Sequence, residues 1–355
     1  MMRKSLLCGW VLTASLLCAA VPATAQDDSE ETVRISTRVV FVDALVQDRQ
    51  TGEPVRNLTA EDFEVLDEGK PRTLTYFSRE GDARRRPLAL LLLLDLEDFG
   101  AGKHLQQPDV IQSLNATLTK LRTEDEVAII GDYFGLEYET LSDFTRDRTQ
   151  TAAALAKVPD LVARGYGKKH ESEKNNKNLH AALEEVSRTA ALARPNSQVV
   201  IVHITDPLII ILNKERSRIA SNLNRGGATY HAITSETEKI FRVMSSIFKP
   251  VMVLARGSFT GTPGYLARRT GGHALRVSDP RDYAPALENI INKLAARYSL
   301  GFTLNENEKG DNQMRRLEVR LRRSARALVG GDRKLTISAR DGYFVPENAD
   351  NRTNK

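Results

Sequence analysis

Cysteine is nearly missing from this sequence. The chain of 355 residues contains two, Cys8 and Cys18, and both lie within the first 25 residues. If that segment is removed, the mature chain has no cysteine. This excludes disulfides, thiolate chemistry and cysteine–zinc sites, so the core must be stable without cross-links.

The first 25 residues have the pattern of a secretory signal peptide. A basic start at Arg3 and Lys4 is followed by an apolar stretch over 5–21 and by small residues at Ala23 and Ala25. The stretch is short for a membrane-spanning helix, which needs about 20 apolar residues. No later run is long enough either. We therefore expect cleavage after Ala25, export to the periplasm or the medium, and no transmembrane segment in the mature chain.

The chain also has a small net charge and few aromatic residues. Loss of Arg3 and Lys4 lowers the formal charge from +5 to +3, and aromatic residues make up 6% of the chain. Basic clusters at 83–87 and 314–326 have few aromatic residues between their charges, which argues against nucleic-acid binding. The six histidines form no tight metal spacing, and no Gly-x-Ser-x-Gly, P-loop or dinucleotide motif is present. We predict that the protein is not an enzyme, with an uncharacterised hydrolase as the minor alternative.

The hydrophobic pattern divides the chain into regions. We expect a signal peptide over 1–25, a disordered lead-in over 26–32, a β region over 33–83, an α/β domain over 84–297, strands over 298–345 and a disordered tail over 346–355. Domain termini often lie close together, so the first and last β regions could pair into one sandwich with the α/β domain inserted between them.

Strands and helices alternate through the α/β region. Residues 88–94 and 198–205 are apolar without alternation, which is typical of strands buried on both faces of a parallel sheet. Helical spacing follows Pro108 and recurs towards Leu294. The pattern predicts an open, mostly parallel sheet with helices on both faces.

Carboxylates follow these apolar strands. Asp95 ends the first, Glu97 and Asp98 come directly after it, and Asp206 follows the later strand. Ligands of open α/β sheets bind beyond the carboxyl ends of the strands, so we expect Asp95 and Asp206 to face one crevice. Clustered carboxylates need a cation nearby or a retained proton. The alternative is that Glu97 and Asp98 point into solvent.

The sequence resembles the von Willebrand factor type A (vWA) domain, and more closely the secreted bacterial proteins known as VWFA-related domain proteins. The resemblance runs through nearly the whole mature chain. It is carried by VRNLTAEDFEVLDEGKPRTLTYFSRE, LALLLLLD, VVIVHITD, LARRTGGHALRV and LAARYSLGFTL through RDGYFVP, in this order. It implies a Rossmann-like vWA fold and binding of a protein partner.

The family's usual metal-ion-dependent adhesion site is altered here. Its first loop reads Asp-x-Ser-x-Ser, and a later strand supplies a second Asp. Asp95 and Asp206 match the two aspartates, but Glu97 and Phe99 replace the serines, and Pro207 stands where glycine is usual. Phenylalanine cannot bind a metal ion. We therefore predict a degenerate site with no cofactor. If an ion is held, it would be Mg²⁺ or Ca²⁺ on Asp95, Glu97 and Asp206.

A threonine from a middle loop normally completes that site. Its position falls near Lys177, or on Asn176 or Asn178 if the loop shifts. A lysine would repel a metal ion. Our hypothesis is that Lys177 or Lys174 places its ammonium among the acids where relatives hold the ion.

These expectations lead to an exported, non-enzymatic binding module. Its predicted binding crevice consists of Asp95, Glu97, Asp98, Phe99, Lys177, Asn178, Asp206 and Pro207. The alternative is an envelope scaffold with a relic crevice. The apolar stretch 207–212 is open to two interpretations: a buried strand extension or helix, or an exposed apolar rim that binds the partner.

Overall fold

The computed structural model describes residues 38–83, 85–133, 137–165, 183, 193–194, 196–207, 211–236, 257–258, 261–305, 308, 313–323 and 335–345. The expected signal peptide, lead-in and tail lie outside the described residues. So do Lys174, Lys177 and Asn178, on which the hypothesis of a protein cation depends. Within the described part of the chain, no helix is long and apolar enough to cross a membrane.

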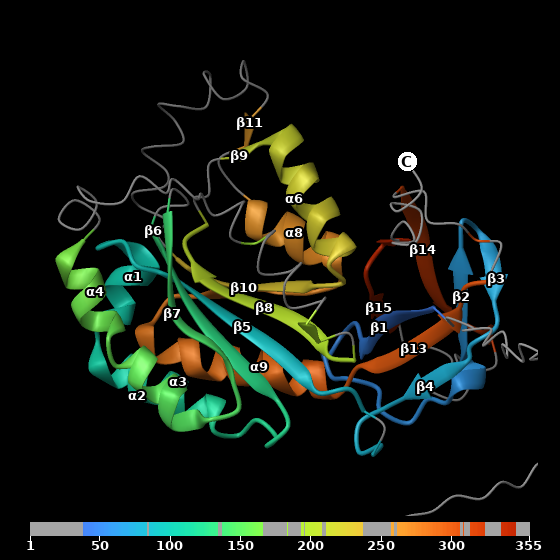
Figure 1. The fold of residues 1–355 in the computed structure, drawn as a ribbon, viewed down its shortest axis with the longest axis horizontal. Coiled ribbons are helices and arrows are strands. Elements are labelled where there is room, and N and C mark those ends of the chain that lie inside the picture. Colours follow the sequence, from blue (N-terminus) through green and yellow to red (C-terminus); the bar gives the residue numbers. More distant parts are fainter. Residues whose placement is uncertain are drawn as a thin grey trace, which may run out of the picture. The chain divides into compact units, whose positions relative to one another are not determined.

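A six-stranded sheet forms the centre of the α/β region (Figure 1). Its strands run in the order β12 (Ala274–Val277), β10 (Thr229–Ser235), β8 (Gln198–Thr205), β5 (Leu88–Asp95), β6 (Glu126–Tyr133) and β7 (Glu137–Thr145). All neighbouring pairs are parallel except β6 and β7, which are antiparallel. Numbered from β5, the order is 3-2-1-4-5-6, that of a doubly wound sheet. The predicted fold class is confirmed.

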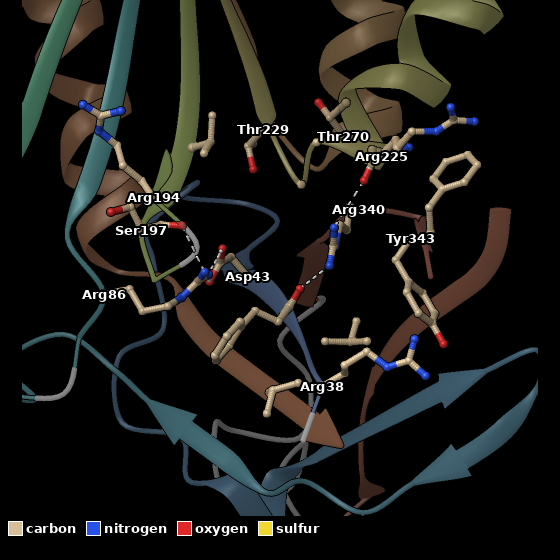
Figure 2. A pocket seen from close by; sticks show the side chains of 18 of the residues that line it. Arg38, Asp43, Arg86, Arg194, Ser197, Arg225, Thr229, Thr270, Arg340 and Tyr343 are labelled. Carbon is tan, nitrogen blue, oxygen red and sulfur yellow. Dashed lines mark hydrogen bonds and ion pairs between the residues drawn. The ribbon is translucent and has the colours of Figure 1, made fainter. Parts of the chain in front are cut away.

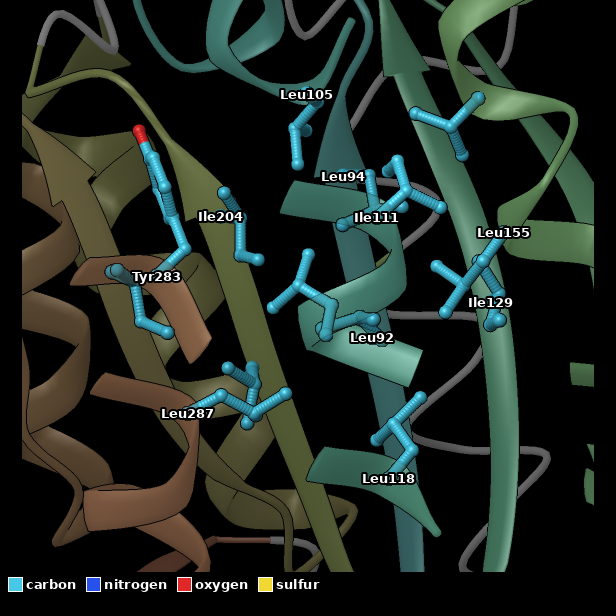
Figure 3. Close-up of a cluster of buried hydrophobic side chains, with 14 of the residues drawn as sticks. Leu92, Leu94, Leu105, Ile111, Leu118, Ile129, Leu155, Ile204, Tyr283 and Leu287 are labelled. Carbon is cyan, nitrogen blue, oxygen red and sulfur yellow. The ribbon is translucent and has the colours of Figure 1, made fainter. Parts of the chain in front are cut away.

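The unbroken leucine run of β5 serves two cores. Every residue of β5 is buried. Leu90, Leu92 and Leu94 pack in the cluster on one face of the sheet, whereas Leu91 and Leu93 pack in the cluster on the other (Figure 3 shows the first). Successive strand side chains point to opposite faces. Each fully buried leucine contributes about 1.5–3 kcal/mol, so the run stabilises the domain from both sides.

Helices cover both faces of this sheet, as expected. One core cluster receives side chains from α1 (Gly100–Leu105), α2 (Pro108–Leu118), α3 (Arg148–Leu155), α4 (Val158–Arg164) and α9 (Tyr283–Ala295). The other receives them from α6 (Asn213–Arg225) and α8 (Thr262–Thr270). The structure also has two short 3₁₀ helices, η1 (Ala60–Asp62) and η3 (Pro280–Asp282).

The first and last strands form two further sheets with one shared core. One sheet runs β15 (Leu335–Ser338), β1 (Val39–Asp48), β13 (Tyr298–Thr303) and β4 (Tyr76–Ser78). The other runs β16 (Gly342–Phe344), β14 (Met314–Leu321), β2 (Phe63–Asp67) and β3 (Lys70–Arg72). Val42, Leu300, Phe63 and Leu317 lie in the same apolar cluster. That residues 84–297 form a separately folding insert stays a prediction.

A tight hairpin lies within the first β region. β2 pairs with β3, whereas β4 pairs with β13 in the other sheet. Glu68 and Gly69 both have positive φ, 49° and 77°. Two such residues make the tight hairpin turn that suits the twist of its strands. Lys70 therefore lies directly opposite Asp67.

Two residues of the apolar stretch after Asp206 form a short strand. β9 (Ile211–Leu212) pairs antiparallel with β11 (Gly257–Ser258). Residues 208–210 lie outside the described part, so the choice between the two interpretations of 207–212 stays open.

Candidate functional site

Three aspartates lie at the carboxyl ends of three neighbouring strands. Asp95 ends β5, Asp132 lies opposite it on β6, and Asp206 directly follows β8. Their exposed fractions are 6%, 3% and 2%. Carboxylates are seldom buried so deeply unless they are paired, so the contacts of each one decide what this edge of the sheet can bind.

Asp95 accepts two hydrogen bonds. The backbone N–H of Glu97 donates to Oδ1 at 3.1 Å, and the Thr205 hydroxyl donates to Oδ2 at 3.3 Å. Thr205 is the last residue of β8. The side chain of Asp95 is therefore held across the two central strands, pointing towards the edge where Asp206 lies.

Asp206 holds the start of a helix. Its Oδ1 accepts from the backbone N–H of Ala101 at 3.1 Å and from the Ser235 hydroxyl. Its Oδ2 is buried and has no partner among the described groups. Ala101 is in the first turn of α1, where an anion is favoured by the unsatisfied N–H groups. Gly100 has φ +52°, and a Cβ there would overlap both carboxylate oxygens of Asp206.

The other predicted loop residues differ in exposure. Glu97 is half-buried, and Asp98 is exposed and accepts a hydrogen bond from Gln106 at 2.9 Å. Phe99 is half-buried and precedes α1 with an extended backbone at φ −153°. Pro207 is half-buried directly after Asp206. Asp98 is thus separate from the buried aspartates and lies on the solvent side of this loop.

Burial and mutual repulsion make these acids hard to ionise. Burial, with the charges of Asp206 and Asp132 nearby, raises the pKa of Asp95 well above its ordinary value. Burial also raises the pKa of Asp206, against the opposing hydrogen bonds from Ser235 and Ala101. The pKa of Glu97 is raised by burial alone. The site therefore favours a retained proton or a nearby cation.

Asp132, Thr205 and Ser235 were missed by the sequence reasoning. Each lies at or next to the carboxyl end of a parallel strand, on β6, β8 and β10 respectively. That position was the available signal, because the carboxyl ends of neighbouring parallel strands meet at one edge. These three residues lie within apolar strands, whereas Glu97, Asp98 and Asp206 follow the strands and are easier to recognise in the sequence.

Asp95 and Asp206 offer few free oxygens to a divalent metal ion. No group of three His, Cys, Asp or Glu side chains is placed to hold a metal ion in the described part of the chain. Asp95 and Asp206 have four carboxylate oxygens between them, and three of these already accept hydrogen bonds from the protein. Phe99 offers no oxygen where the family's pattern has a serine. The expected loss of the ion site stays a prediction, because Lys177 lies outside the described residues.

The buried histidines make hydrogen bonds inside the fold. His203 is fully buried on β8, and its Nδ1 is 2.8 Å from the Tyr230 hydroxyl. Burial lowers its pKa to about 3. The backbone N–H of His273 donates to Nδ1 of His231 at 3.2 Å. A histidine that stays neutral inside the sheet is poorly suited to general acid–base work near neutral pH.

We expect Asp95→Asn to stabilise the protein at pH 7. The asparagine keeps the shape and removes the charge that burial, Asp206 and Asp132 oppose. The melting temperature should rise by several degrees, since about 1 kcal/mol corresponds to roughly 2–4 °C for a domain of 150–250 residues. Thermal unfolding followed by circular dichroism measures the change.

The pH dependence checks the cause. An acid whose pKa is raised on folding holds its proton longer in the folded state, so stability falls as pH rises from about 4 through that raised pKa. The slope should be present in the wild-type protein and reduced in the Asp95→Asn variant. Destabilisation by Asp95→Asn at pH 7 would instead show that a cation balances this carboxylate.

Comparisons with known proteins find likeness in structure only. No protein-family model and no curated protein matches the chain. The structure is similar to BatB from Bacteroides thetaiotaomicron (14% identity, TM-score 0.40, 59% of this chain and 98% of that one). It is also similar to a von Willebrand factor type A protein from Catenulispora acidiphila (10%, 0.39, 84% and 77%) and to an Rpn10 VWA domain (14%, 0.34, 58% and 95%).

These similarities have TM-scores below 0.5, so the assignment of the fold depends on the topology. The resemblance implied an open, mostly parallel sheet with helices on both faces, and the structure has such a sheet, in the order 3-2-1-4-5-6 with the single antiparallel strand β7 at one end. The aspartates after β5 and β8 lie at the edge that the same fold uses for ligands. The chain therefore has a fold of the von Willebrand factor type A kind.

Proposed function

We propose that the protein is an exported, non-enzymatic binding module that holds a protein partner at the carboxyl edge of its central sheet, without a divalent ion. The observation that carries this proposal is the layered acid cluster. Asp95, Asp132 and Asp206 are buried, Glu97 is half-buried and Asp98 is exposed. This gradient of exposure leaves negative charge at the surface of the loop, where it can attract a basic side chain of the partner.

Independence from metal is supported by how the aspartate oxygens are used. In an ion site, Asp206 would offer its carboxylate to the ion, but here its Oδ1 accepts from Ala101 and Ser235 and holds the start of α1, so only the buried Oδ2 is left. Asp95 likewise accepts from Glu97 and Thr205. A basic group of the partner could interact with Glu97 and Asp98 without disturbing these bonds.

Titration with Mg²⁺ or Ca²⁺ should give no saturable heat and no rise in melting temperature. A ligand that binds only the folded state at 100 times its dissociation constant stabilises it by about 2.7 kcal/mol, so a real ion site would be easy to detect. Isothermal titration calorimetry and thermal unfolding with and without chelator measure both quantities. A clear saturable heat would overturn the metal-free proposal while leaving partner binding open.

Capture of a partner from envelope extract tests the binding surface. The Glu97→Lys, Asp98→Lys double variant should lose the captured protein, because two acids at the surface loop become bases, and chelator should have no effect on wild-type capture. Glu61→Lys reverses an exposed acid in the terminal β region and is the matched control. Equal capture by all three proteins would favour the scaffold alternative with a relic crevice.

A further inference from the structure

A second candidate site lies at the opposite end of the central sheet, where the parallel strands β8 and β10 begin. A cavity of about 380 Å³ opens between β1 and the amino ends of β8 and β10 (Figure 2). Val199 and Thr229 line it from these two strands, and Val40 and Phe41 line it from β1. A strand of eight residues is roughly 26 Å long, so this cavity is well separated from Asp95 and Asp206. Its volume lies in the range of small-molecule sites.

The lining of the cavity is strongly cationic. Five arginines and a single acid, Asp43, line it; the arginines are Arg38, Arg86, Arg194, Arg225 and Arg340. Arg194 is paired outside the cavity with Glu126, and Arg86 is paired with Asp43 at 2.6 Å. Arg225 and Arg340 form no ion pair within the described part of the chain.

Asp43 has no capacity left for a further cation. Its oxygens accept from Arg86 at 2.6 and 2.8 Å, from Ser299 at 2.5 Å and from Gln198 at 3.1 Å. Burial opposes its ionisation, but Arg86, Ser299 and Arg297 outweigh burial, and its pKa is lowered. Asp43 is therefore fully ionised and fully occupied at neutral pH.

Arg340 is a buried cation of the lining whose bonds to the protein go to backbone carbonyls. It donates to the backbone carbonyls of Phe41 and, at 3.5 Å, of Asn224, and its Nε has no partner among the described groups. In the described part of the chain no carboxylate forms an ion pair with it. Burial lowers its pKa to about 10, so it keeps its charge at neutral pH. In Figure 2 the guanidinium of Arg340 lies in the middle of the labelled side chains.

The rim combines charge with apolar surface. The exposed Arg225 stacks over Phe344 with 4.5 Å from its guanidinium carbon to the ring centroid. Val40, Phe41 and Leu304 add apolar area. A ligand that suits this lining carries an anionic group on a small organic body.

We propose that this cavity binds a small organic carboxylate or phosphate, whose anionic group is held by Arg340 with Arg225 at the rim. Charge-assisted bonds from guanidinium to carboxylate or phosphate are short and directional, which makes arginine the usual residue for this recognition. The ligand supplies the negative charge that Asp43 alone does not provide. Because the cavity lies between strands from the two ends of the chain and the central sheet, binding also stabilises the junction of these parts.

Calorimetry at constant ionic strength tests the site, with inorganic phosphate and succinate as separate probes. We expect saturable binding of at least one probe with a dissociation constant on the order of 1 mM or lower. The two arms distinguish a phosphate site from a carboxylate site. Arg340→Gln should weaken binding at least about tenfold, the effect of losing one charged hydrogen-bonding group. Arg281→Gln, which changes an arginine 88% exposed outside the cavity, should leave binding unchanged.

Two further variants keep the test decisive if Arg340→Gln does not fold. Arg225→Gln at the exposed rim should weaken binding, and Asp43→Asn should tighten it, because the only acid of the lining is neutralised. Failure of both probes to saturate would overturn the proposal. So would equal affinities for the wild-type, Arg225→Gln and Asp43→Asn proteins, which would leave Arg340 as a structural link between Phe41 and Asn224.

Discussion

Asp43→Ala is expected to lower the free energy of unfolding by about 3–5 kcal/mol, the usual cost of breaking a buried ion pair by removing one partner. The side chains of Asp43 and Arg86 are 15% and 10% exposed. Arg297 is also buried, and Asp43 is the charge that favours its ionised form. Without Asp43, both guanidinium groups are left without an ion-pair partner among the described residues. Urea unfolding at pH 7 measures the loss.

The relative losses in the free energy of unfolding test whether the ion pair is the cause. Arg86→Ala should cost less than Asp43→Ala, because Ser299 and Gln198 still donate to the Asp43 carboxylate when Arg86 is gone. Glu288→Ala is the matched control. It breaks the exposed pair with Lys120, and exposed pairs contribute about 0–1 kcal/mol. A loss for Asp43→Ala no larger than that of the control would show that this junction is not held by charge.

Gly100→Ala is the second large expected effect, about 2–4 kcal/mol of destabilisation. Part of it comes from φ +52° at Gly100, where a side chain is disfavoured. The rest comes from overpacking, because the new Cβ would overlap the carboxylate of Asp206. That carboxylate cannot move freely, since it accepts from Ala101 and Ser235. The variant should therefore disturb the start of α1 as well as the stability, which amide chemical shifts of Ala101 would report.

Gly52→Ala separates the two contributions. Gly52 has φ +72°, but nothing lies within 4 Å of the position that its Cβ would take. It should show only the backbone cost, about 1 kcal/mol. If Gly100→Ala and Gly52→Ala destabilise equally, then Asp206 is free to move away and its bonds to Ala101 and Ser235 are not rigid.

The central sheet could be predicted because its strands have a strong local signal. The apolar residues of β5 and β8 do not alternate, and only a strand covered on both faces accommodates such a run. Pro108 was expected in a first helical turn and begins α2. The hairpin after Asp67 depends on backbone conformation. The positive φ of Glu68 and Gly69 makes its turn two residues long and thereby selects β3 as the partner of β2.

The candidate site could be predicted only in part. Acids that follow an apolar strand are visible in the sequence, so Asp95 and Asp206 were found. Which hydroxyls would donate to them was not visible, because Thr205 and Ser235 read as ordinary residues of buried strands. The arginine cavity gave no signal at all. Its arginines come from separated segments, and each one alone resembles a solvated surface charge.

The sequence by itself determined which segments are buried strands, which are helices, and that acids stand at the carboxyl ends of two strands. Only the tertiary structure decided which side chains meet. Asp43 contacts Arg86 across 43 positions of the chain and Ser299 across 256. The physical reason is that the local spacing of apolar residues reports how each segment meets water, whereas a contact between distant residues depends on how the packed sheets and helices bring them together.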